Sequence, residues 1–229
     1  MSTRVGIIAE GPIDLALLPP ILRRIAEERA GVNWPVQVAD AFEWLQMRPR
    51  GHGGVLMAIR RIVRVLQRQP EFPYAFIVIL LDRRTQKVRE RVPKLIAGKD
   101  RFVLGVAQEE IEAWWLGDRT NTLRWLDFSE PPSGTRYAAS GYVAERDDDP
   151  KRTVHELTEK SSRLDRVYGE GNLDLARDFA DLWDGQVRLK EIETQCPKQF
   201  LPFCGDTTQA FRRTKSRSSR LVQGTLKLN

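Results

Sequence analysis

Cysteine and histidine are scarce in this sequence. Its 229 residues include two cysteines, Cys196 and Cys204, and two histidines, His52 and His155. A structural zinc site needs about four Cys or His ligands at close spacing, and these residues do not supply them. A chain of this length buries enough apolar surface to fold without disulfides. We therefore expect reduced thiols and a cytoplasmic location.

Long apolar runs and familiar nucleotide-binding motifs are also missing. No run reaches the roughly 18 to 20 apolar residues that a membrane span requires, and the first residues show no secretory signal. The sequence has neither a Gly-x-x-x-x-Gly-Lys-Ser/Thr loop nor a Gly-x-Gly-x-x-Gly turn after a strand, which argues against ATP hydrolysis by this chain. We expect a protein that is neither exported nor inserted into a membrane.

Acidic residues are absent from the last part of the chain. Residues 207–229 contain six basic residues, and removing these from the 37 Lys and Arg leaves 31, equal to the 31 Asp and Glu. This tail therefore accounts for the net charge of +6. A basic tail fits a nucleic-acid partner, for which Arg212, Arg213 and Lys215 are candidate contacts. A disordered, solubilising terminus is the alternative.

Apolar runs of strand length alternate with helical patterns in the first half of the chain. The runs are Val5–Ala9, Ala75–Leu81 and Phe102–Val106. Helical spacing follows the first run, where the prolines at 19 and 20 predict a kink or a break, and it recurs over residues 56–66 and 109–116. Strands that are apolar throughout are typical of a parallel sheet covered on both faces. The pattern predicts an α/β, Rossmann-like fold with a mainly parallel sheet flanked by helices.

The pattern changes beyond about residue 120. We expect an α/β domain over residues 1–120, a mainly helical C-terminal region over 121–206 packed on it, and a basic tail over 207–229. The helices predicted in the second region are Thr153–Lys160, Leu173–Trp183 and Val187–Thr194. Trp114 and Trp115 are predicted as core residues rather than as a platform for stacking bases.

Carboxylates stand at the ends of the predicted strands. Glu10 follows the first strand, Asp82 follows the second, and Glu112 lies in the helix after the third. Ligands of parallel sheets bind at the carboxyl ends of the strands, so these three acids are the candidate catalytic and metal-binding residues, with Asp14 as a further metal ligand. Oxygen ligands suit Mg²⁺ or Mn²⁺. The alternatives are a helix-capping role for Asp82 and a solvated helix position for Glu112.

Two segments resemble motifs of the TOPRIM domain of topoisomerases, primases and recombination proteins. "VGIIAEGPIDLALLPPIL" resembles the first motif, a strand ending in Glu-Gly before a helix, and "AFIVILLDRRT" resembles the second, a strand ending in Asp. The stretches "RPRGHGG", "EEIEAWWLGD", "DPKR" and "CPKQFLPF" extend the resemblance to bacterial TOPRIM-like proteins related to the overcoming-lysogenization-defect nucleases. It implies that Glu10 is a general acid or base and Asp82 a ligand of Mg²⁺.

One position departs from the motif. TOPRIM proteins usually have Asp-x-Asp at the second motif, whereas this sequence has Arg84 in place of the second acid. Arginine repels a cation rather than binding it, which puts two-metal chemistry in doubt. Three alternatives follow: another acid replaces the missing carboxylate, Arg84 binds a phosphate directly, or the site is inactive. The candidates for the replacement are Asp14, Glu109, Glu110, Glu112 and Asp118.

The leading hypothesis is a Mg²⁺-dependent nuclease-like protein that acts on a nucleic-acid backbone, with Arg50, Arg83 or Arg84 holding phosphates. The resemblance implies bacterial defence against phage or mobile elements as its setting. The second hypothesis is a catalytically inactive TOPRIM-fold subunit that binds nucleic acid or a partner ATPase. A small-molecule phosphotransfer enzyme is the third. The sequence leaves the oligomeric state open.

Overall fold

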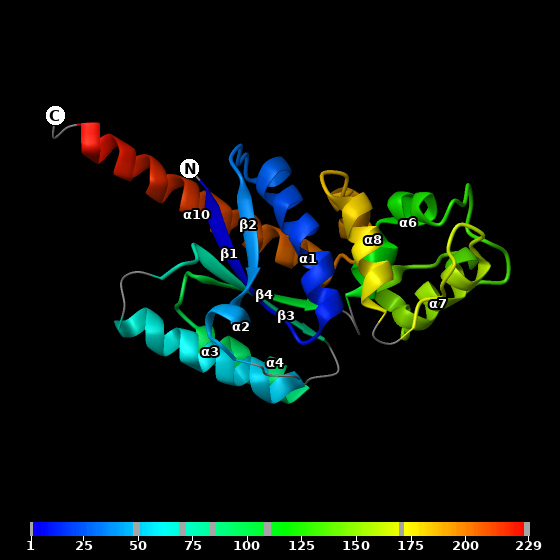
Figure 1. Cartoon of the computed structure of the whole chain (residues 1–229), viewed down its shortest axis with the longest axis horizontal. Coiled ribbons are helices and arrows are strands. Elements are labelled where there is room, and N and C mark those ends of the chain that lie inside the picture. Colours follow the sequence, from blue (N-terminus) through cyan, green and yellow to red (C-terminus); the bar gives the residue numbers. More distant parts are fainter. Residues whose placement is uncertain are drawn as a thin grey trace.

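The computed structural model describes residues 2–47, 51–68, 72–82, 86–107, 111–169 and 172–226. A central sheet has helices on both of its faces and further helices at one end (Figure 1). Its strands are β1 (Thr3–Ile8), β2 (Val36–Asp40), β3 (Phe76–Asp82) and β4 (Phe102–Ala107), in the order β2-β1-β3-β4, and every neighbouring pair is parallel. The predicted α/β fold with a parallel sheet is confirmed.

Helices make up most of the remaining structure. In chain order they are α1 (Pro12–Arg24), η1 (Ile25–Arg29), α2 (Ala41–Trp44), α3 (Gly51–Arg68), α4 (Gln86–Ile96), α5 (Glu112–Gly117), α6 (Arg119–Trp125), η2 (Arg136–Ala138), η3 (Ala144–Arg146), α7 (Pro150–Lys160), α8 (Leu173–Trp183), α9 (Leu189–Gln195) and α10 (Phe200–Leu226). The bounds predicted for α8 are confirmed, whereas the sequence pattern identified neither β2 nor α4.

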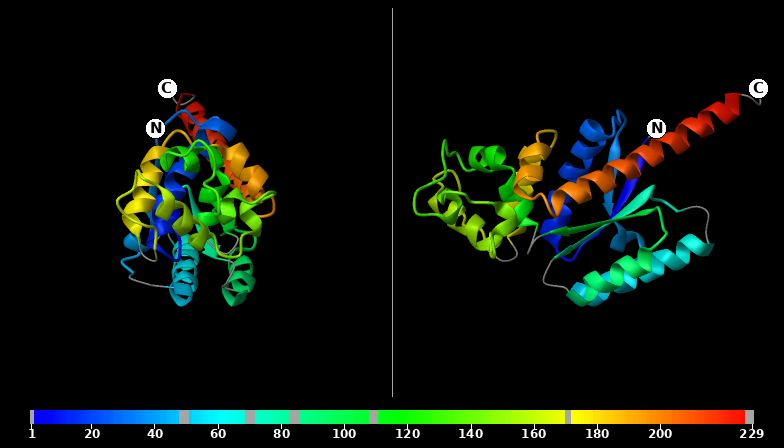
Figure 2. Two further views of the ribbon diagram at one scale, coloured as in Figure 1. Left: turned by 90° about the vertical axis from the view of Figure 1, so that its right-hand side faces the viewer. Right: turned by 180° about the vertical axis from the view of Figure 1, so that it is seen from behind.

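Alternate residues of β3 face opposite sides of the sheet. Phe76, Val78 and Leu80 point to the side covered by α1 and α10, whereas Ile77 and Ile79 point to the side covered by α2, α3 and α4. Figure 2 shows α10 crossing the sheet on the side away from α3 and α4. Because both faces are covered, this strand is apolar throughout, as the sequence suggested.

The prolines at positions 19 and 20 do not break α1. The helix continues through both and passes into a π-helical turn at Ile25–Arg29. Its neighbours along the helix, Leu17, Leu18, Ile21 and Leu22, are completely buried against the core. This apolar burial outweighs the cost of about 3 kcal/mol that a proline imposes inside a helix. The predicted break is therefore wrong, and the alternative, a kink, stays a prediction.

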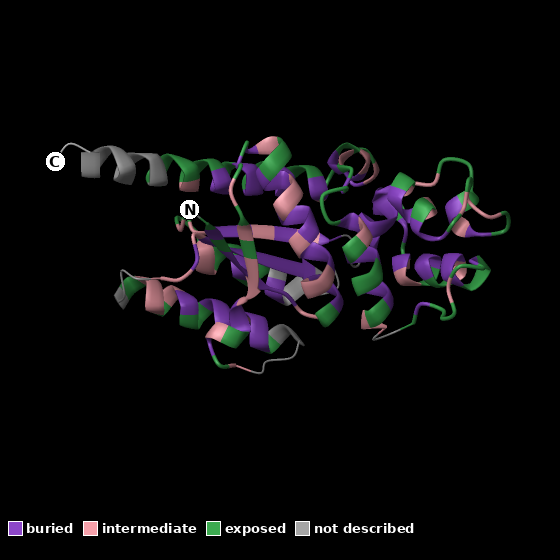
Figure 3. Cartoon of the chain, turned by 45° about the horizontal axis from the view of Figure 1, so that its top comes forward, coloured by how far each residue is buried: buried purple, intermediate pink, exposed green. Residues whose placement is uncertain are grey.

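The C-terminal helices share one hydrophobic core with the face of the sheet that α1 and α10 cover. That core joins Leu17 of α1 and Val78 of β3 to Phe179 of α8 and Phe200 of α10. In Figure 3 the buried residues are concentrated in the strands and on the helix sides that face them. The expected boundary at residue 120 falls inside α6, and the one at residue 206 falls inside α10.

Residues 207–226 of the segment expected as a basic tail belong to α10, a long helix that packs on β4. Thr207, Ala210 and Phe211 are buried, and the Phe211 ring lies edge-on to Phe76 with centroids 4.9 Å apart. Gly105 of β4 leaves room for this helix, since a Cβ there would stand 2.9 Å from the Phe203 ring. Within the described residues, no helix is long and apolar enough to cross a membrane.

We predict that Phe211→Ala lowers the free energy of unfolding by about 3 to 5 kcal/mol, because it removes a fully buried ring. Urea unfolding of the purified protein measures the change. Gln209→Ala, at an exposed position of the same helix, is the control and should change stability by less than about 0.5 kcal/mol. Equal stability of the two variants would mean that α10 does not pack on the sheet in solution.

Candidate functional site

The carboxyl ends of β1, β3 and β4 meet at one edge of the sheet. Ile8 of β1 pairs with Ile79 of β3, and Glu10 follows two residues after Ile8. Asp82 ends β3 and pairs with the last residue of β4. The backbone therefore brings the predicted positions at the first two strand ends to neighbouring strands, although the side chain of Asp82 lies outside the description.

Asp14 lies next to this edge, at the start of α1. Its carboxylate accepts a hydrogen bond from the backbone N–H of Gly11 at 2.9 Å, which fixes the turn that carries Glu10. The pKa of Asp14 is raised to about 7, mainly by burial and then by the charges of the Glu112 carboxylate and, to a smaller extent, the Glu10 carboxylate. The Gly11 hydrogen bond and the charge of Lys151 oppose this rise. Asp14 therefore feels both neighbouring acids.

Glu112 opens α5 and is almost completely buried, so the structure does not leave it as a solvated helix position. Its carboxylate accepts a hydrogen bond of 2.5 Å from the hydroxyl of Tyr168, which is itself buried. The ring of Tyr168 packs edge-on against Trp115, with centroids 5.4 Å apart. Tyr168 had no assigned role in the sequence analysis, since a tyrosine 56 residues from its partner carries no local signal.

Lys151 is a second residue near these acids that no local sequence pattern indicates. It lies in the first turn of α7, whose N-terminal cap is the side chain of Asp149. The positive charge of Lys151 lowers the pKa of Asp14, so it acts on the same group of acids. The signal was present in the stretch "DPKR", but nothing in that stretch indicates that α7 reaches the end of β1.

The described carboxylates fit a magnesium site only in part. Among the side chains that the structure describes, no three Asp, Glu, His or Cys residues are gathered closely enough to hold a metal ion. Mg²⁺ in phosphoryl-transfer sites commonly takes one or two carboxylates, with waters and substrate phosphates completing the shell. Glu10 together with Asp82 satisfies that requirement in its chemistry. Asp14 and Glu112 accept hydrogen bonds from the Gly11 backbone and from Tyr168.

Asp118 does not belong to this site. It caps α6 and is completely buried, and its carboxylate accepts hydrogen bonds from the indole of Trp183 at 2.8 Å and the backbone of Arg188 at 2.9 Å. It therefore ties the start of α6 to the α8–α9 connection and is not a replacement for the missing motif acid. Several other candidates lie outside the described residues, namely Arg50, Arg83, Arg84, Glu109 and Glu110.

The basic residues of α10 lie at the opposite end of the sheet, where the strands begin. Arg212 and Lys215 donate hydrogen bonds to the carbonyls of Arg29 and Gly31, which precede β2. Arg213 donates to the carbonyl of Asp100, which precedes β4. The structure thus brings Glu10, Asp14 and Glu112 together and does not bring these three basic residues to them.

The geometry defines a class of fold, an α/β protein with a Rossmann-like parallel sheet and acidic residues at its carboxyl edge. Comparison with protein-family models, with curated proteins and with solved structures gives no match for this chain. The TOPRIM resemblance of the sequence motifs therefore remains a hypothesis that the residues of the site must support.

The raised pKa of Asp14 gives a prediction for stability. The unfolded carboxyl titrates near 3.8 and the folded one near 7, so between these values the folded state holds a proton that the unfolded state has lost. The free energy of unfolding should then fall as the pH rises through this window, by up to about 1.4 kcal/mol per pH unit.

Asp14→Asn should flatten this fall, because the amide does not titrate and still accepts the Gly11 hydrogen bond. Urea unfolding between about pH 4 and pH 8, with a chelator present, provides the measurement. Asp165→Asn, an exposed carboxyl on the loop after α7, is the matched control and should leave the slope unchanged. Parallel curves for wild type and Asp14→Asn would contradict the assigned pKa.

Proposed function

We propose that this protein is a Mg²⁺-dependent nuclease-like protein of the TOPRIM type that acts on the phosphodiester backbone of a nucleic acid. The observation that supports this proposal is the meeting of Glu10, Asp14 and Glu112 at the carboxyl edge of a parallel sheet, next to the strand end that carries Asp82. Bacterial defence against phage or mobile elements, in the cytoplasm, is the setting that the sequence resemblance implies.

Each residue has a distinct role in this proposal. Glu10 and Asp82 hold a Mg²⁺ or Mn²⁺ ion, which when bound withdraws charge from a phosphoryl oxygen. Glu10 is partly exposed, so it also reaches the reacting oxygens and transfers a proton. Lys151 supplies a positive charge to the phosphate, as it does to Asp14. Arg50, Arg83 and Arg84 are proposed as further phosphate contacts.

The two buried acids position the site rather than react. Asp14 fixes the Glu10–Gly11 turn through its hydrogen bond to the Gly11 N–H. Glu112 is held by Tyr168 and is about 1% exposed, which leaves its carboxylate out of reach of a nucleic-acid strand. The charges of Glu112 and Glu10 both raise the pKa of Asp14, so the potential at this edge is negative, which favours cation binding.

A catalytically inactive TOPRIM-fold subunit that binds nucleic acid or a partner ATPase is the second candidate. Two observations favour it: Arg84 replaces the second acid of the motif, and the described side chains contain no three-ligand metal group. In this reading the acids at the sheet edge are a remnant of the site. Arg212, Arg213 and Lys215 on α10 are then the remaining nucleic-acid contacts to test.

Glu10→Gln separates these candidates. The amide preserves the size of the side chain but neither transfers a proton nor carries charge, so cleavage should slow by on the order of 10² to 10⁴ with little change in stability. The measurement is cleavage of single- and double-stranded DNA and RNA with Mg²⁺, Mn²⁺ or chelator, alongside a thermal melt. Glu130→Gln, on an exposed loop, is the control and should cleave at the wild-type rate.

Cleavage by Glu10→Gln at the wild-type rate would remove Glu10 from the proposed site. Absence of cleavage by the wild type on all four substrates, with nucleic-acid binding retained, would favour the inactive subunit.

Arg84→Asp tests the departure from the motif, because it restores the usual acidic pair and removes a cation. If the protein is an inactive subunit, this change should raise its affinity for Mg²⁺ by about tenfold or more in a calorimetric titration. If Arg84 holds the scissile phosphate of an active nuclease, the same change should abolish cleavage. If neither the affinity for Mg²⁺ nor the rate of cleavage changes, Arg84 does not face the site.

A further inference from the structure

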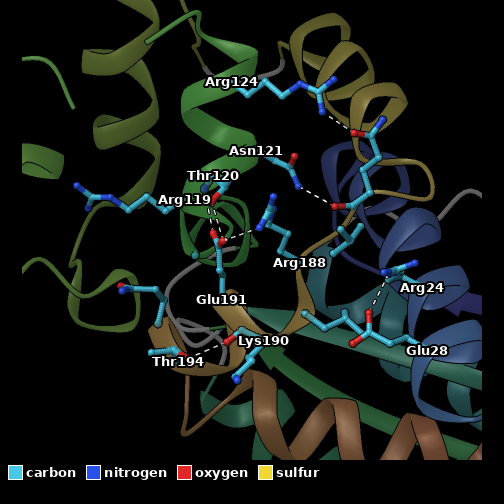
Figure 4. A pocket seen from close by; sticks show the side chains of 15 residues that line it. Arg24, Glu28, Arg119, Thr120, Asn121, Arg124, Arg188, Lys190, Glu191 and Thr194 are labelled. Atoms are coloured by element: carbon cyan, nitrogen blue, oxygen red, sulfur yellow. Dashed lines mark hydrogen bonds and ion pairs between the residues drawn. The ribbon is translucent and has the colours of Figure 1, made fainter. Parts of the chain in front are cut away.

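A second concave site lies on the helical side of the molecule, between the C-terminal end of α1, the start of α6 and the α8–α9 connection (Figure 4). Its volume is about 850 Å³, which is within the range of about 300 to 1,000 Å³ typical of small-molecule sites. The basic residues that line it are Arg24, Arg119, Arg124, Arg188 and Lys190. They come from three separate parts of the chain.

Two carboxylates line the same cleft, and both are already compensated. Glu191 accepts hydrogen bonds from the backbone N–H and the hydroxyl of Thr120, at 2.9 and 2.6 Å, and lies 3.5 Å from Arg188. Glu28 forms an ion pair with Arg24 at 3.0 Å. With five basic and two acidic side chains in its lining, the cleft has an excess of positive charge.

That excess resides on three side chains. Arg124 donates a hydrogen bond to the neutral side chain of Gln186 at 2.6 Å, and the guanidinium of Arg119 lies over the ring of Tyr137. Within the described ranges, neither these two residues nor Lys190 has a carboxylate at ion-pair distance. Lys190 and Arg124 are exposed, so their charges are available to a ligand from solvent.

The cleft is separate from the acidic edge of the sheet. Arg24 ends α1, whereas Glu10 precedes it, and the 13 residues of this helix at 1.5 Å each place the two about 20 Å apart. A substrate phosphate at Glu10 therefore does not occupy this cleft. Its electrostatic character is also opposite, which indicates an anionic ligand rather than a cation.

We propose that this cleft binds a compound with several phosphate groups, either a free nucleotide or the phosphorylated end of a nucleic-acid strand. Arg124 and Lys190 would contact the phosphates through charge-assisted hydrogen bonds. None of the lining side chains that the structure describes is aromatic, so the cleft offers the base no stacking surface. Affinity should therefore follow the number of phosphates and not the identity of the base.

Calorimetric titration in the presence of chelator tests this proposal, because without metal the acidic edge does not bind phosphate. The probes are tripolyphosphate, ATP, GTP and AMP, together with a short oligonucleotide with and without a 5′-phosphate. We expect tripolyphosphate, ATP and GTP to bind with similar affinity and AMP to bind more weakly. Lys190→Gln and Arg124→Gln should each weaken binding by about tenfold or more.

Two sets of controls separate this site from general charge and from the proposed nuclease site. Arg91→Gln and Lys94→Gln, at exposed positions of α4, remove the same charge elsewhere and should bind as the wild type does. Glu10→Gln should also bind normally, so this inference does not depend on the nuclease proposal. Preference for the 5′-phosphorylated oligonucleotide would identify a strand end as the ligand, and preference for ATP would identify a free nucleotide.

The proposal is overturned if none of these compounds binds the wild type. It is also overturned if the α4 controls lose as much affinity as Lys190→Gln, because binding then reflects net charge alone.

Discussion

The packing of α5 against two later helices of the chain fixes the geometry of the candidate site. The ring of Trp114 stacks on Phe203 of α10 with centroids 4.9 Å apart, and that of Trp115 stacks on Phe179 of α8 at 4.5 Å. Neither indole N–H has a hydrogen-bond partner among the described residues, so apolar burial holds both rings. Because α5 begins at Glu112, this packing also holds that carboxylate at the sheet edge.

Burial makes the charges at this edge strongly dependent on one another. Asp14 and Glu112 are buried away from water. In the protein interior the repulsion between carboxylates is less screened than in water, so the protonated form of Asp14 is favoured. Two residues of the helical region reduce the cost of burying these carboxylates: Tyr168 donates a hydrogen bond to Glu112, and the charge of Lys151 lowers the pKa of Asp14. The sheet and the helices therefore form the site jointly. The basic cleft at the other end of α1 has the opposite excess of charge and more contact with water.

The fold class and the positions of the strand-end acids follow from local patterns in the sequence. Runs such as Ala75–Leu81 are apolar on both faces, a local property that predicts a covered parallel strand wherever it occurs. The same local reading placed Trp114 and Trp115 in the core and gave the bounds of α8. It did not identify β2, because every residue of this edge strand is at least partly exposed and the strand has no continuous apolar pattern.

Which distant residues share a site depends on how the helical region packs against the sheet. Tyr168 contacts Glu112, and Lys151 lies near Asp14, because the helical region packs against the end of the sheet. No repeating pattern in the sequence links the two regions. The same packing turned the expected basic tail into α10, whose Phe211 is buried on β3 and β4 although its charges dominate the local composition. Composition records the charges of a segment, whereas burial depends on which surface of the fold lies beneath it.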